Sequence, residues 1–394
     1  MEPIFLSRGA KFAIERLESR GYEAYAVGGC VRDSLLGTAP HDCDLTTRAT
    51  PNQTAAAFAD CRIIETGMKH GTVTVLYKGE AIEITTYRLD GDYPDNRHPA
   101  SVTFSESLAD DLARRDFTVN AMAYHPVRGL VDLFGGKDDL RRGVIRCVGD
   151  AVTRFHEDGL RILRAVRFAS VLDFSLENET SRAVHACVSL LDNIARERIR
   201  EEWNKLLLGT AADRILREYT DVVSQIFPNV APPPLVIRIA DAPTDLITRL
   251  TLFFYAYGLD ADAAMRRLRY NNASREEVVS LLRFAEAPVE PTEASVRRLL
   301  ASLSPEVFRR LTDVKRGIGF PVSETVSVIA ETILSRGDCL SLRTLAVDGK
   351  DLMEIGIPEG KPLGDVLNRL LDSVMNGDLP NEKAALLSAA KKWR

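Results

Sequence analysis

The sequence predicts an α+β protein in which a mixed α/β part is followed by a longer helical part. Strand and helix signals alternate up to about residue 140, whereas after about residue 150 the strand signals fade and helical periods dominate. The chain has 394 residues, which is too long for one small core. We therefore expect two to four domains.

The elements of the mixed part follow from hydrophobic periods and from the glycines that interrupt them. Alternating apolar and polar residues on both sides of Gly79 are typical of a hairpin. In chain order we expect an amphipathic helix ended by Gly21, a strand at 22–27, helical turns at 31–36, a hairpin of 71–78 with 80–88, a mobile loop at 90–101, and a helix followed by a short strand at 117–134.

The second part is expected to be helical throughout. Residues 153–170 and 194–208 show strong helical periods, and a Pro-rich break follows at 228–234. The remaining sequence predicts short helices joined by polar links near 286–292 and 336–340.

Composition excludes several classes of protein. Hydrophobic residues make up 45% and charged residues 27%, which is typical of a soluble globular protein, and no apolar run is long enough to cross a membrane. The beginning of the chain predicts a helix rather than a signal peptide, so we expect a cytoplasmic protein. The six cysteines form no CxxC pair, which argues against a zinc site or a disulfide framework.

Charge distribution is more informative than net charge. The formal net charge of −5 argues against a protein that coats nucleic acid non-specifically. A local basic surface for RNA remains compatible with this value. The arginines gather in four segments, which are 114–115, 141–146, 161–167 and 196–200.

The first chemical motif combines GGCVRD at 28–33 with HDCDL at 41–45. Asp42 and Asp44 stand one residue apart, so on a strand their carboxylates point to the same face and are able to share magnesium ions. The glycines before them let backbone N–H groups approach a triphosphate, and Arg32 adds positive charge. A solvated turn is the alternative interpretation of an isolated DxD motif.

Two further segments supply candidate residues for the same chemistry. Glu83 alternates with apolar neighbours on the second hairpin strand and is the candidate for a third catalytic carboxylate, although an exposed strand glutamate fits the pattern equally well. In RRDFTVNAMAY, Arg115 is a candidate for phosphate or ribose contacts, and Asp116 and Asn120 for a ribose hydroxyl. Helix capping is the alternative for this motif.

A third motif, RFHEDGLRILRAVRFAS at 154–170, suggests recognition of a base. On one helix, Asp158 and Arg161 share a face that Arg164 and Arg167 continue. Cytosine and adenine each present an amino donor beside a ring-nitrogen acceptor, which one carboxylate and one guanidinium satisfy together. Uracil and guanine place a ring N–H opposite the guanidinium, a costly mismatch in a dry pocket. A salt-bridged helix surface is the alternative.

Together these residues resemble the class II tRNA nucleotidyltransferase and bacterial poly(A) polymerase family. Within it, the chain is most similar in pattern to CCA-adding enzymes of the bacterial type without a phosphohydrolase domain. Order and spacing of the motifs match over most of the chain. The matching segments are GGCVRDSLLG, HDCDLTT, EITTYR, RRDFTVNAMAY, VDLFGGKDDLRRGVIRCVGD, RFHEDGLRILRAVRFA and ERIREEWNKLL.

This resemblance implies a fold and a set of site residues. It implies a polymerase-β-like head with a small mixed sheet, followed by all-α neck, body and tail domains. We expect the catalytic head at 1–140, the nucleotide-selecting neck at 141–212, the body at 213–300 and the tRNA-binding tail at 301–394. The family's metal carboxylates fall on Asp42 and Asp44, its nucleotide contacts on Gly29, Arg32 and Arg115, and its amino-acid template on Asp158 and Arg161 with Arg164 and Arg167 nearby.

The activity implied is template-independent addition of C, C and A to the 3′ end of tRNA from CTP and ATP, with Mg²⁺ in a two-metal transfer. Addition of A alone and poly(A) synthesis on the same scaffold are the alternatives, and an inactive RNA-binding protein is a third. The intact segment 88–104 favours A addition over enzymes limited to CC, and the end of the chain resembles the tRNA enzymes. A monomer or a homodimer is expected.

The tail contains a candidate contact for the tRNA elbow. In GIPEGKPLG, Gly356, Gly360 and Gly364 are expected to leave backbone N–H groups open for phosphates. A plain turn between two helices is the alternative.

Overall fold

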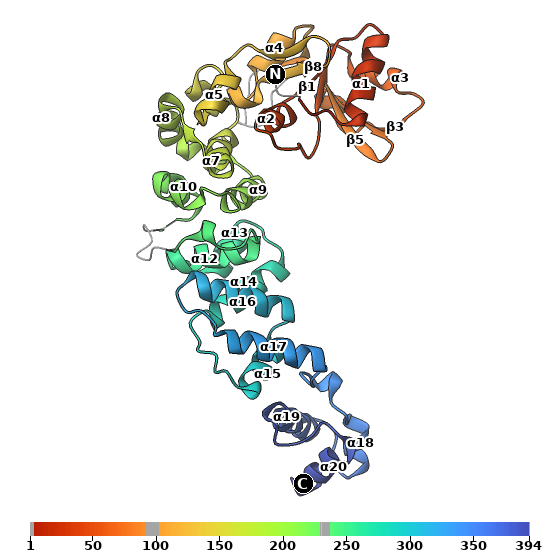
Figure 1. Cartoon of the computed structure of the whole chain (residues 1–394), viewed down its shortest axis with the longest axis vertical. Coiled ribbons are helices and arrows are strands. Elements are labelled where there is room, and N and C mark those ends of the chain that lie inside the picture. Colours follow the sequence, from red (N-terminus) through yellow and green to blue (C-terminus); the bar gives the residue numbers. More distant parts are fainter. Residues whose placement is uncertain (1–3, 91–101, 229, 231–236, 394) are drawn as a thin grey trace. The chain divides into compact units, whose positions relative to one another are not determined.

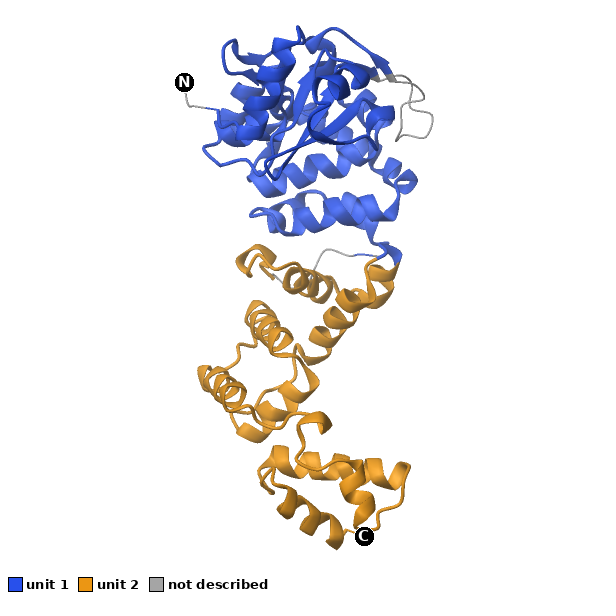
Figure 2. Ribbon diagram, turned by 90° about the vertical axis from the view of Figure 1, so that its right-hand side faces the viewer, with its two compact units in different colours: residues 1–232, 267–269 blue, residues 233–266, 270–394 orange. Residues whose placement is uncertain are grey.

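The computed structural model describes residues 4–90, 102–228, 230 and 237–393. The chain divides into two compact units, coloured blue and orange in Figure 2. The first unit comprises residues 1–232 with 267–269, and the second comprises 233–266 with 270–394. The first unit contains a mixed sheet with helices, whereas the described residues of the second are helices and connections (Figure 1). The predicted α+β class is confirmed.

A seven-stranded mixed sheet forms the centre of the first unit. All neighbouring strands in it run antiparallel except β2 and β5, which run parallel. In spatial order the strands are β3 (Arg62–Ile64), β4 (Thr72–Tyr77), β5 (Glu80–Thr86), β2 (Leu45–Thr47), β1 (Ala24–Val27), β8 (Met122–His125) and β9 (Gly129–Asp132).

The predicted hairpin around Gly79 is present as β4 and β5. Tyr77 pairs with Glu80 across a two-residue turn. Both turn residues have positive φ, with 49° at Lys78 and 85° at Gly79. Such turns match the right-handed twist of the strands, and glycine adopts this conformation without strain.

Helices and connections cover the sheet. The predicted amphipathic helix is α1 (Arg8–Ser19), whose first turn is capped by the Ser7 hydroxyl accepting from the N–H of Ala10 at 3.0 Å, and α1 packs against β1 and β5. An apolar cluster joins Tyr25 and Val27 of β1 to Leu112. The other helices of this region are α2 (Gly29–Leu35), α3 (Pro51–Ala57), α4 (Leu108–Ala113) and α5 (Gly136–Arg142).

Two predicted elements are wrong in detail. The helix and strand expected at 117–134 are a 3₁₀ turn (Thr118–Asn120) followed by the hairpin of β8 and β9. The single helix expected at 153–170 is two helices, α6 (Ala151–Glu157) and α7 (Leu160–Leu172), because Asp158 has an extended backbone with φ −139° and ψ 105°. An apolar helical period on both sides of a break gives no signal of the break itself.

The remaining part of the first unit is largely helical. Its predicted helix at 194–208 is α9 (Arg196–Leu207), which packs along α7. The chain after α9 approaches α7 so closely that a Cβ on Gly209 would lie 2.2 Å from Oγ of Ser170. The other elements are β10 (Val144–Ile145) and β11 (Ser175–Leu176), which pair in parallel, and α8 (Asn178–Cys187), α10 (Ala212–Glu218) and α11 (Thr220–Ile226).

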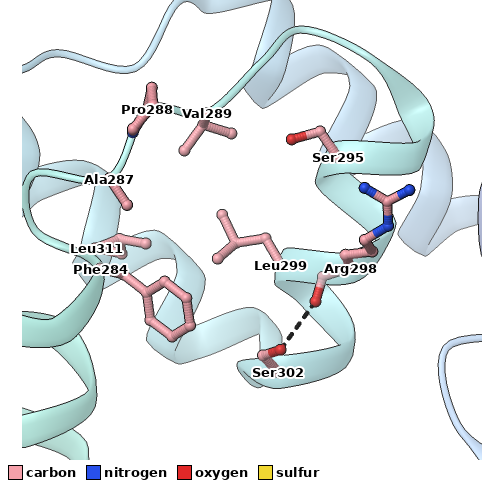
Figure 3. A pocket seen from close by; sticks show the side chains of 9 residues that line it. All are labelled: Phe284, Ala287, Pro288, Val289, Ser295, Arg298, Leu299, Ser302 and Leu311. Atoms are coloured by element: carbon pink, nitrogen blue, oxygen red, sulfur yellow. Dashed lines mark hydrogen bonds between the residues drawn. The ribbon is translucent and has the colours of Figure 1, made fainter.

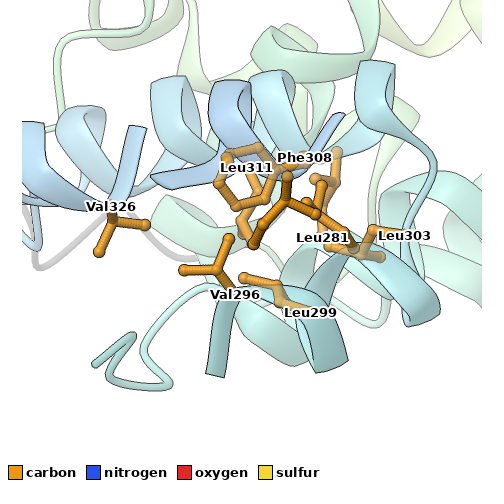
Figure 4. Packing of buried hydrophobic residues seen from close by; sticks show 10 residues of the cluster. Leu281, Val296, Leu299, Leu303, Phe308, Leu311 and Val326 are labelled. Atoms are coloured by element: carbon orange, nitrogen blue, oxygen red, sulfur yellow. The ribbon is translucent and has the colours of Figure 1, made fainter. Parts of the chain in front are cut away.

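The described residues of the second unit include two apolar clusters. One joins Leu281, Val296, Phe308 and Val326 from four successive helices (Figure 4), and it includes residues on both sides of the predicted boundary at 300 and 301. The other lies towards the end of the chain around Leu352, Leu370 and Leu386. The helices are α12 (Leu246–Tyr257), α13 (Ala261–Arg267), α14 (Asn272–Phe284), α15 (Glu293–Ser302), α16 (Pro305–Gly317), α17 (Glu324–Arg336), α18 (Gly349–Glu354), α19 (Lys361–Asn376) and α20 (Lys383–Lys392).

Two expected connections fall largely outside the described residues. The loop expected at 90–101 is one of them, but its two ends are paired as β6 (Arg88–Asp90) and β7 (Val102–Phe104). The Pro-rich break at 228–234 is the other. The polar links near 286–292 and 336–340 separate helices as expected. No described helix is long and apolar enough to cross a membrane.

Candidate active site

Sheet topology brings the first motifs to one edge. β1 and β2 are antiparallel, so the end of β1 lies beside the start of β2, where the N–H of Val27 donates to the carbonyl of Asp44 at 3.0 Å. The next residues along the chain are Gly28 and Gly29. On the other side of β2, the parallel strand β5 pairs Ile84 with Leu45. Glu83 therefore stands at the register position beside Asp44.

Asp42 and Asp44 precede β2 rather than lying within it, which corrects the expectation of a strand position. The expected common face is nevertheless kept, because Asp42 and Asp44 are exposed while Cys43 between them is buried. Glu83 is also exposed, between the buried Ile82 and Ile84.

The carboxylates of Asp42, Asp44 and Glu83 form a negatively charged cluster. The Asp44 side chain keeps contact with solvent, yet desolvation by the surrounding protein, together with the negative charges of Asp42 and Glu83, raises its pKa to about 6. The positive charge of Arg115 opposes this shift of the pKa. Two adjacent carboxylates that repel one another are suited to a divalent cation.

Among the described residues, no group of three or more His, Cys, Asp or Glu side chains is arranged to hold a metal ion by itself. Magnesium binds through one or two carboxylates together with water and substrate phosphates. The donor set of Asp42 and Asp44 fits that requirement for a nucleotide-dependent cation. It does not fit a resident ion held entirely by the protein.

Gly28 makes room for Arg115. Gly28 has φ 72°, and a Cβ at this position would lie 3.3 Å from Nη1 of Arg115. The Arg115 guanidinium pairs with the buried carboxylate of Asp111 at 3.1 Å, whereas its Nε is buried and has no acceptor among the described residues. A guanidinium beside a glycine with an unsatisfied N–H is suited to a phosphate or ribose oxygen.

Asp116 and Asn120 connect two of the predicted arginines instead of standing free. Arg32 donates to Oδ1 of Asn120 at 2.7 Å, and the Asn120 amide donates to Oδ1 of Asp116 at 3.1 Å. The other Asp116 oxygen accepts two bonds from Arg164, at 2.9 and 2.6 Å. Burial opposes the ionised form of Asp116, but Arg164 and the donors around it lower its pKa to about 2. Both Asp116 oxygens already have donors, so its expected role with ribose gives way to holding Arg164.

Phe168 is a site residue that none of the sequence motifs indicated. Its ring carries three guanidinium groups, whose central carbons lie 3.5 Å (Arg167), 5.1 Å (Arg32) and 5.4 Å (Arg164) from the ring centroid. Glu202 of α9 then pairs with Arg167 at 2.8 Å. A cation–π platform holds like charges close together at modest cost. The apolar period of α7 gave no indication of this role.

Asp158 and Arg161 lie in the same site but are not on one helix. Asp158 belongs to the link between α6 and α7 and pairs with Arg198 at 3.0 Å. Arg161 stands in the first turn of α7, pairs with Glu157, and donates to the carbonyl of Arg114 at 3.0 Å. Each member of the predicted template therefore has its own supporting partner.

These elements enclose a cavity of about 620 Å³, large enough for a nucleotide. Asp42, Asp44, Gly29 and all five predicted arginines line it, whereas Glu83 does not. The cavity also includes residues without a prior assignment, of which Lys205 and Phe168 are the clearest. The lining consists of Gly28, Gly29, Arg32, Asp42, Asp44, Arg114, Arg115, Asp116, Asn120, Asp158, Arg161, Arg164, Arg167, Phe168 and Lys205.

A second cavity, of about 240 Å³, lies in the second unit and differs in chemistry (Figure 3). Its walls are mainly apolar, and the hydroxyl of Ser302 donates to the carbonyl of Arg298 at 3.0 Å within its own helix. None of the described residues that line it carries a carboxylate. Of these two cavities, only the one in the first unit combines carboxylates and guanidinium groups.

The glycines of the tail do not form the expected open set of N–H groups. The N–H of Gly356 donates to the carbonyl of Met353 at 2.9 Å, and that of Gly364 donates to the carbonyl of Gly360 at 3.3 Å inside α19. Gly360, with φ 99°, is the N-cap of that helix. The prediction that Gly356 and Gly364 leave their backbone N–H groups open for phosphates is therefore wrong.

The mixed-sheet head, its paired carboxylates and its arginine-lined cavity define a nucleotidyltransferase. Family models agree over three segments. Residues 24–146 match "Poly A polymerase head domain", 173–232 match "Probable RNA and SrmB- binding site of polymerase A", and 243–390 match a model for domain 2 of tRNA nucleotidyltransferases.

Full-length relatives give the family. The chain is 38% identical over 384 residues to a CCA-adding enzyme of Lactobacillus delbrueckii subsp. bulgaricus, covering 95% of this chain and 94% of that one. It is also 38% identical over 382 residues to a CCA-adding enzyme of Geobacillus stearothermophilus, covering 94% and 93%. The chain belongs to the CCA-adding enzyme family.

Solved structures agree with this assignment. The Bacillus stearothermophilus CCA-adding enzyme in complex with CTP superposes with a TM-score of 0.88 at 34% identity, covering 100% of this chain and 98% of that one. The Thermotoga maritima CCA-adding enzyme complexed with tRNA has a TM-score of 0.65 at 23% identity, covering 97% and 94%. At that identity the likeness concerns the fold alone.

Proposed function

We propose that this chain adds C, C and A to the 3′ end of tRNA, using CTP and ATP and no nucleic-acid template. The observation that carries the proposal is the presence of Asp42, Asp44, Asp158 and Arg161 in one cavity. The first pair serves phosphoryl chemistry, and the second pair serves base selection. The names of the full-length relatives support the same reaction. We place this activity in the cytoplasm.

Phosphoryl transfer is assigned to the sheet edge. Asp42 and Asp44 would hold divalent cations, which we propose to be Mg²⁺, with Glu83 as an additional negative group beside Asp44. When bound, such cations neutralise the charge that develops on the attacking and leaving oxygens. Gly29, Arg32 and Arg115 would hold the triphosphate in line with the RNA 3′ end.

Base selection is assigned to the α6–α7 link. Asp158 would accept a hydrogen bond from the amino group of cytosine or adenine, and Arg161 would donate to the neighbouring ring nitrogen. UTP and GTP would leave Arg161 facing a donor. Arg164 and Arg167, fixed on Phe168, would supply further nucleotide contacts.

One observation supports addition of A as well as C, and a second supports full CCA addition. The strands β6 and β7 are formed, so the ends of the segment expected for A addition are ordered as a ribbon. The relatives that match over nearly the whole chain are named CCA-adding enzymes. Addition of A alone, poly(A) synthesis and an inactive RNA-binding protein remain the alternatives, and they give different products in one assay.

That assay offers four tRNA transcripts, which lack all three terminal nucleotides, the last two, the last one or none. Labelled CTP or ATP is supplied with Mg²⁺, and products are separated on a gel. We expect C, then C, then A, and no further growth. A ladder of A residues would show poly(A) synthesis, extension only of the transcript lacking A would show an A-adding enzyme, and no extension would favour the inactive protein.

The carboxylates are tested in the same assay. Asp42→Ala should lower incorporation by about a thousandfold or more, because metal stabilisation of the transition state is worth several kcal/mol. Asp60→Ala is the matched control, since Asp60 is an exposed aspartate that pairs with Arg16 outside the cavity. Full activity of Asp42→Ala would refute the metal assignment.

A further inference from the structure

The Asp158 carboxylate is held in place by donors other than Arg161. Its Oδ1 accepts from the backbone N–H of Leu160 at 3.0 Å, which closes a turn between α6 and α7. Arg198 of α9 donates to Oδ2 through Nη2 at 3.0 Å and to Oδ1 through Nη1 at 3.5 Å. The guanidinium therefore faces both carboxylate oxygens.

These bonds limit how many acceptor sites the Asp158 carboxylate can offer to a base. A carboxylate offers about four lone-pair sites. The Leu160 N–H and the two Arg198 groups occupy three of them. The site that remains is sufficient for one amino group of cytosine or adenine. An unrestrained carboxylate would instead turn and offer acceptors in several directions.

Arg161 likewise uses most of its N–H groups on protein acceptors. Of its five N–H groups, Nη1 uses two on Glu157 and on the carbonyl of Arg154, and Nη2 uses one on the carbonyl of Arg114. Two N–H groups thus remain within the described surroundings. Both members of the proposed template are therefore held by protein partners, Asp158 by Arg198 and Arg161 by Glu157.

Arg198 acts from outside the cavity. It is not among the lining residues, its side chain is 27% exposed, and the Asp158 side chain is 17% exposed. It reaches Asp158 because α9 packs along α7. Arg198 therefore stands behind Asp158 as seen from the cavity and contacts it directly.

We propose that Arg198 is a positioning residue for base selection, which fixes Asp158 so that one acceptor points at the incoming base. This inference rests on the proposed function. Without the fork of Arg198, the Asp158 carboxylate rotates about its side-chain bonds and also accepts the ring N–H of uracil or guanine. Discrimination between nucleotides then falls more than the rate of correct addition.

The test measures kcat/KM for CTP and UTP on the transcript lacking all three nucleotides, in single additions by the full-length protein. Arg198→Met keeps the aliphatic stem and removes the guanidinium. We expect the CTP to UTP ratio to fall by about tenfold or more, with kcat for CTP changing less than the ratio. Arg198→Lys should restore part of the ratio, because it returns the charge without the fork.

Two controls separate positioning from a merely structural contact. Arg196→Met removes an arginine of the same helix with similar exposure, 26%, whose partner Asp192 lies 4.0 Å away. It should leave the ratio unchanged. In a double-mutant cycle, Arg198→Met should have little further effect on the ratio when Asp158 is already alanine.

The outcomes distinguish this inference from the proposed function. A wild-type ratio in Arg198→Met, or full additivity with Asp158→Ala, overturns the role of Arg198 and leaves the proposed function intact. If Arg198→Met melts early, the ratio in Arg198→Lys decides, and an unchanged ratio there overturns the inference. A wild-type protein with no preference for CTP over UTP overturns both.

Discussion

At the scale of single residues, Asp116 joins the two halves of the cavity. It accepts from Asn120, which holds Arg32 near the sheet, and from Arg164 on α7. Its carboxylate is buried, so a missing partner would leave a charge or a donor unsatisfied. Asp116 therefore contributes to stability and to the geometry of the site together.

Asp116→Asn should destabilise the protein in a pH-dependent way. The pKa of Asp116 is about 2 in the fold against 3.8 ordinarily, so its contribution of about 2 kcal/mol is complete above pH 4 and is lost as the pH falls towards 2. Urea unfolding should give a constant wild-type-to-variant difference from pH 7 to 5 and a smaller one below pH 4. The exposed control Asp60→Asn should change little. A difference that grows towards acid pH would contradict this account.

Residue types and spacing in the sequence were enough to name most of the residues that line the cavity, but not Phe168 or Lys205 and not the partners of the named residues. Asp42, Asp44 and the arginines stand in short motifs, so their chemistry is readable locally. The pairing of Asp158 with Arg198 and the stacking of three arginines on Phe168 join positions that only packing of α7 against α9 brings together. Phe168 falls in the apolar period of α7 and is buried, so the sequence gives no sign of its contact with the arginines.

At the scale of elements, α7 and the end of α9 are in close backbone contact behind the site. Gly209 follows α9, and Ser170 of α7 lies against it, with its hydroxyl donating to the carbonyl of Leu206 at 2.7 Å. A Cβ on Gly209 would lie 2.5 Å from the backbone carbonyl carbon of Ser170. This contact sets the distance between the two helices.

Gly209→Ala should therefore destabilise the protein by about 1–3 kcal/mol, because backbone atoms have to move apart. The same substitution at Gly364 should be neutral or stabilising by up to about 1 kcal/mol. Gly364 lies within α19, has no neighbour near its added Cβ, and alanine favours helices. Thermal melting of the two variants checks the opposite signs. Equal shifts in both would refute the close-packing explanation.

Elements with strong local signals were predicted well. The hairpin of β4 and β5 and the helix α1 have clear periods, and glycines end or turn them. The break between α6 and α7 was missed because Asp158 is stabilised in an extended conformation by Leu160 and Arg198, and the latter is forty residues away. The hairpin of β8 and β9 was missed because its place in the sheet is set by β1.

At the scale of the whole molecule, the last cluster of helices is a separate apolar core. It comprises residues around Leu352, Leu370 and Leu386 and is joined to α15 by hydrogen bonds from Arg297 to the carbonyl of Met375 and from Arg298 to Asn376. We propose that this part of the chain binds tRNA. Its loss should not reach the nucleotide cavity, whose lining lies between residues 28 and 205.

Removal of residues 340–394 should weaken tRNA binding by more than about tenfold, or 1.4 kcal/mol, and leave CTP binding unchanged. Filter binding measures the first and calorimetry the second. A melting curve shows that the first unit still folds. Unchanged tRNA affinity in a folded truncated protein would refute the assignment of the tail.

In the proposed function, the metal-binding carboxylates lie at the sheet edge and the base-reading pair lies at the α6–α7 link, and this separation bears on how the specificity of the enzyme could be changed. On our proposals, residues 28–44 serve bond formation, and residues 157–167 together with Arg198 serve the choice of base. A laboratory lineage selected to incorporate an altered base would change the second set and keep the first. Such an enzyme would keep the same bond-forming chemistry and add a different base.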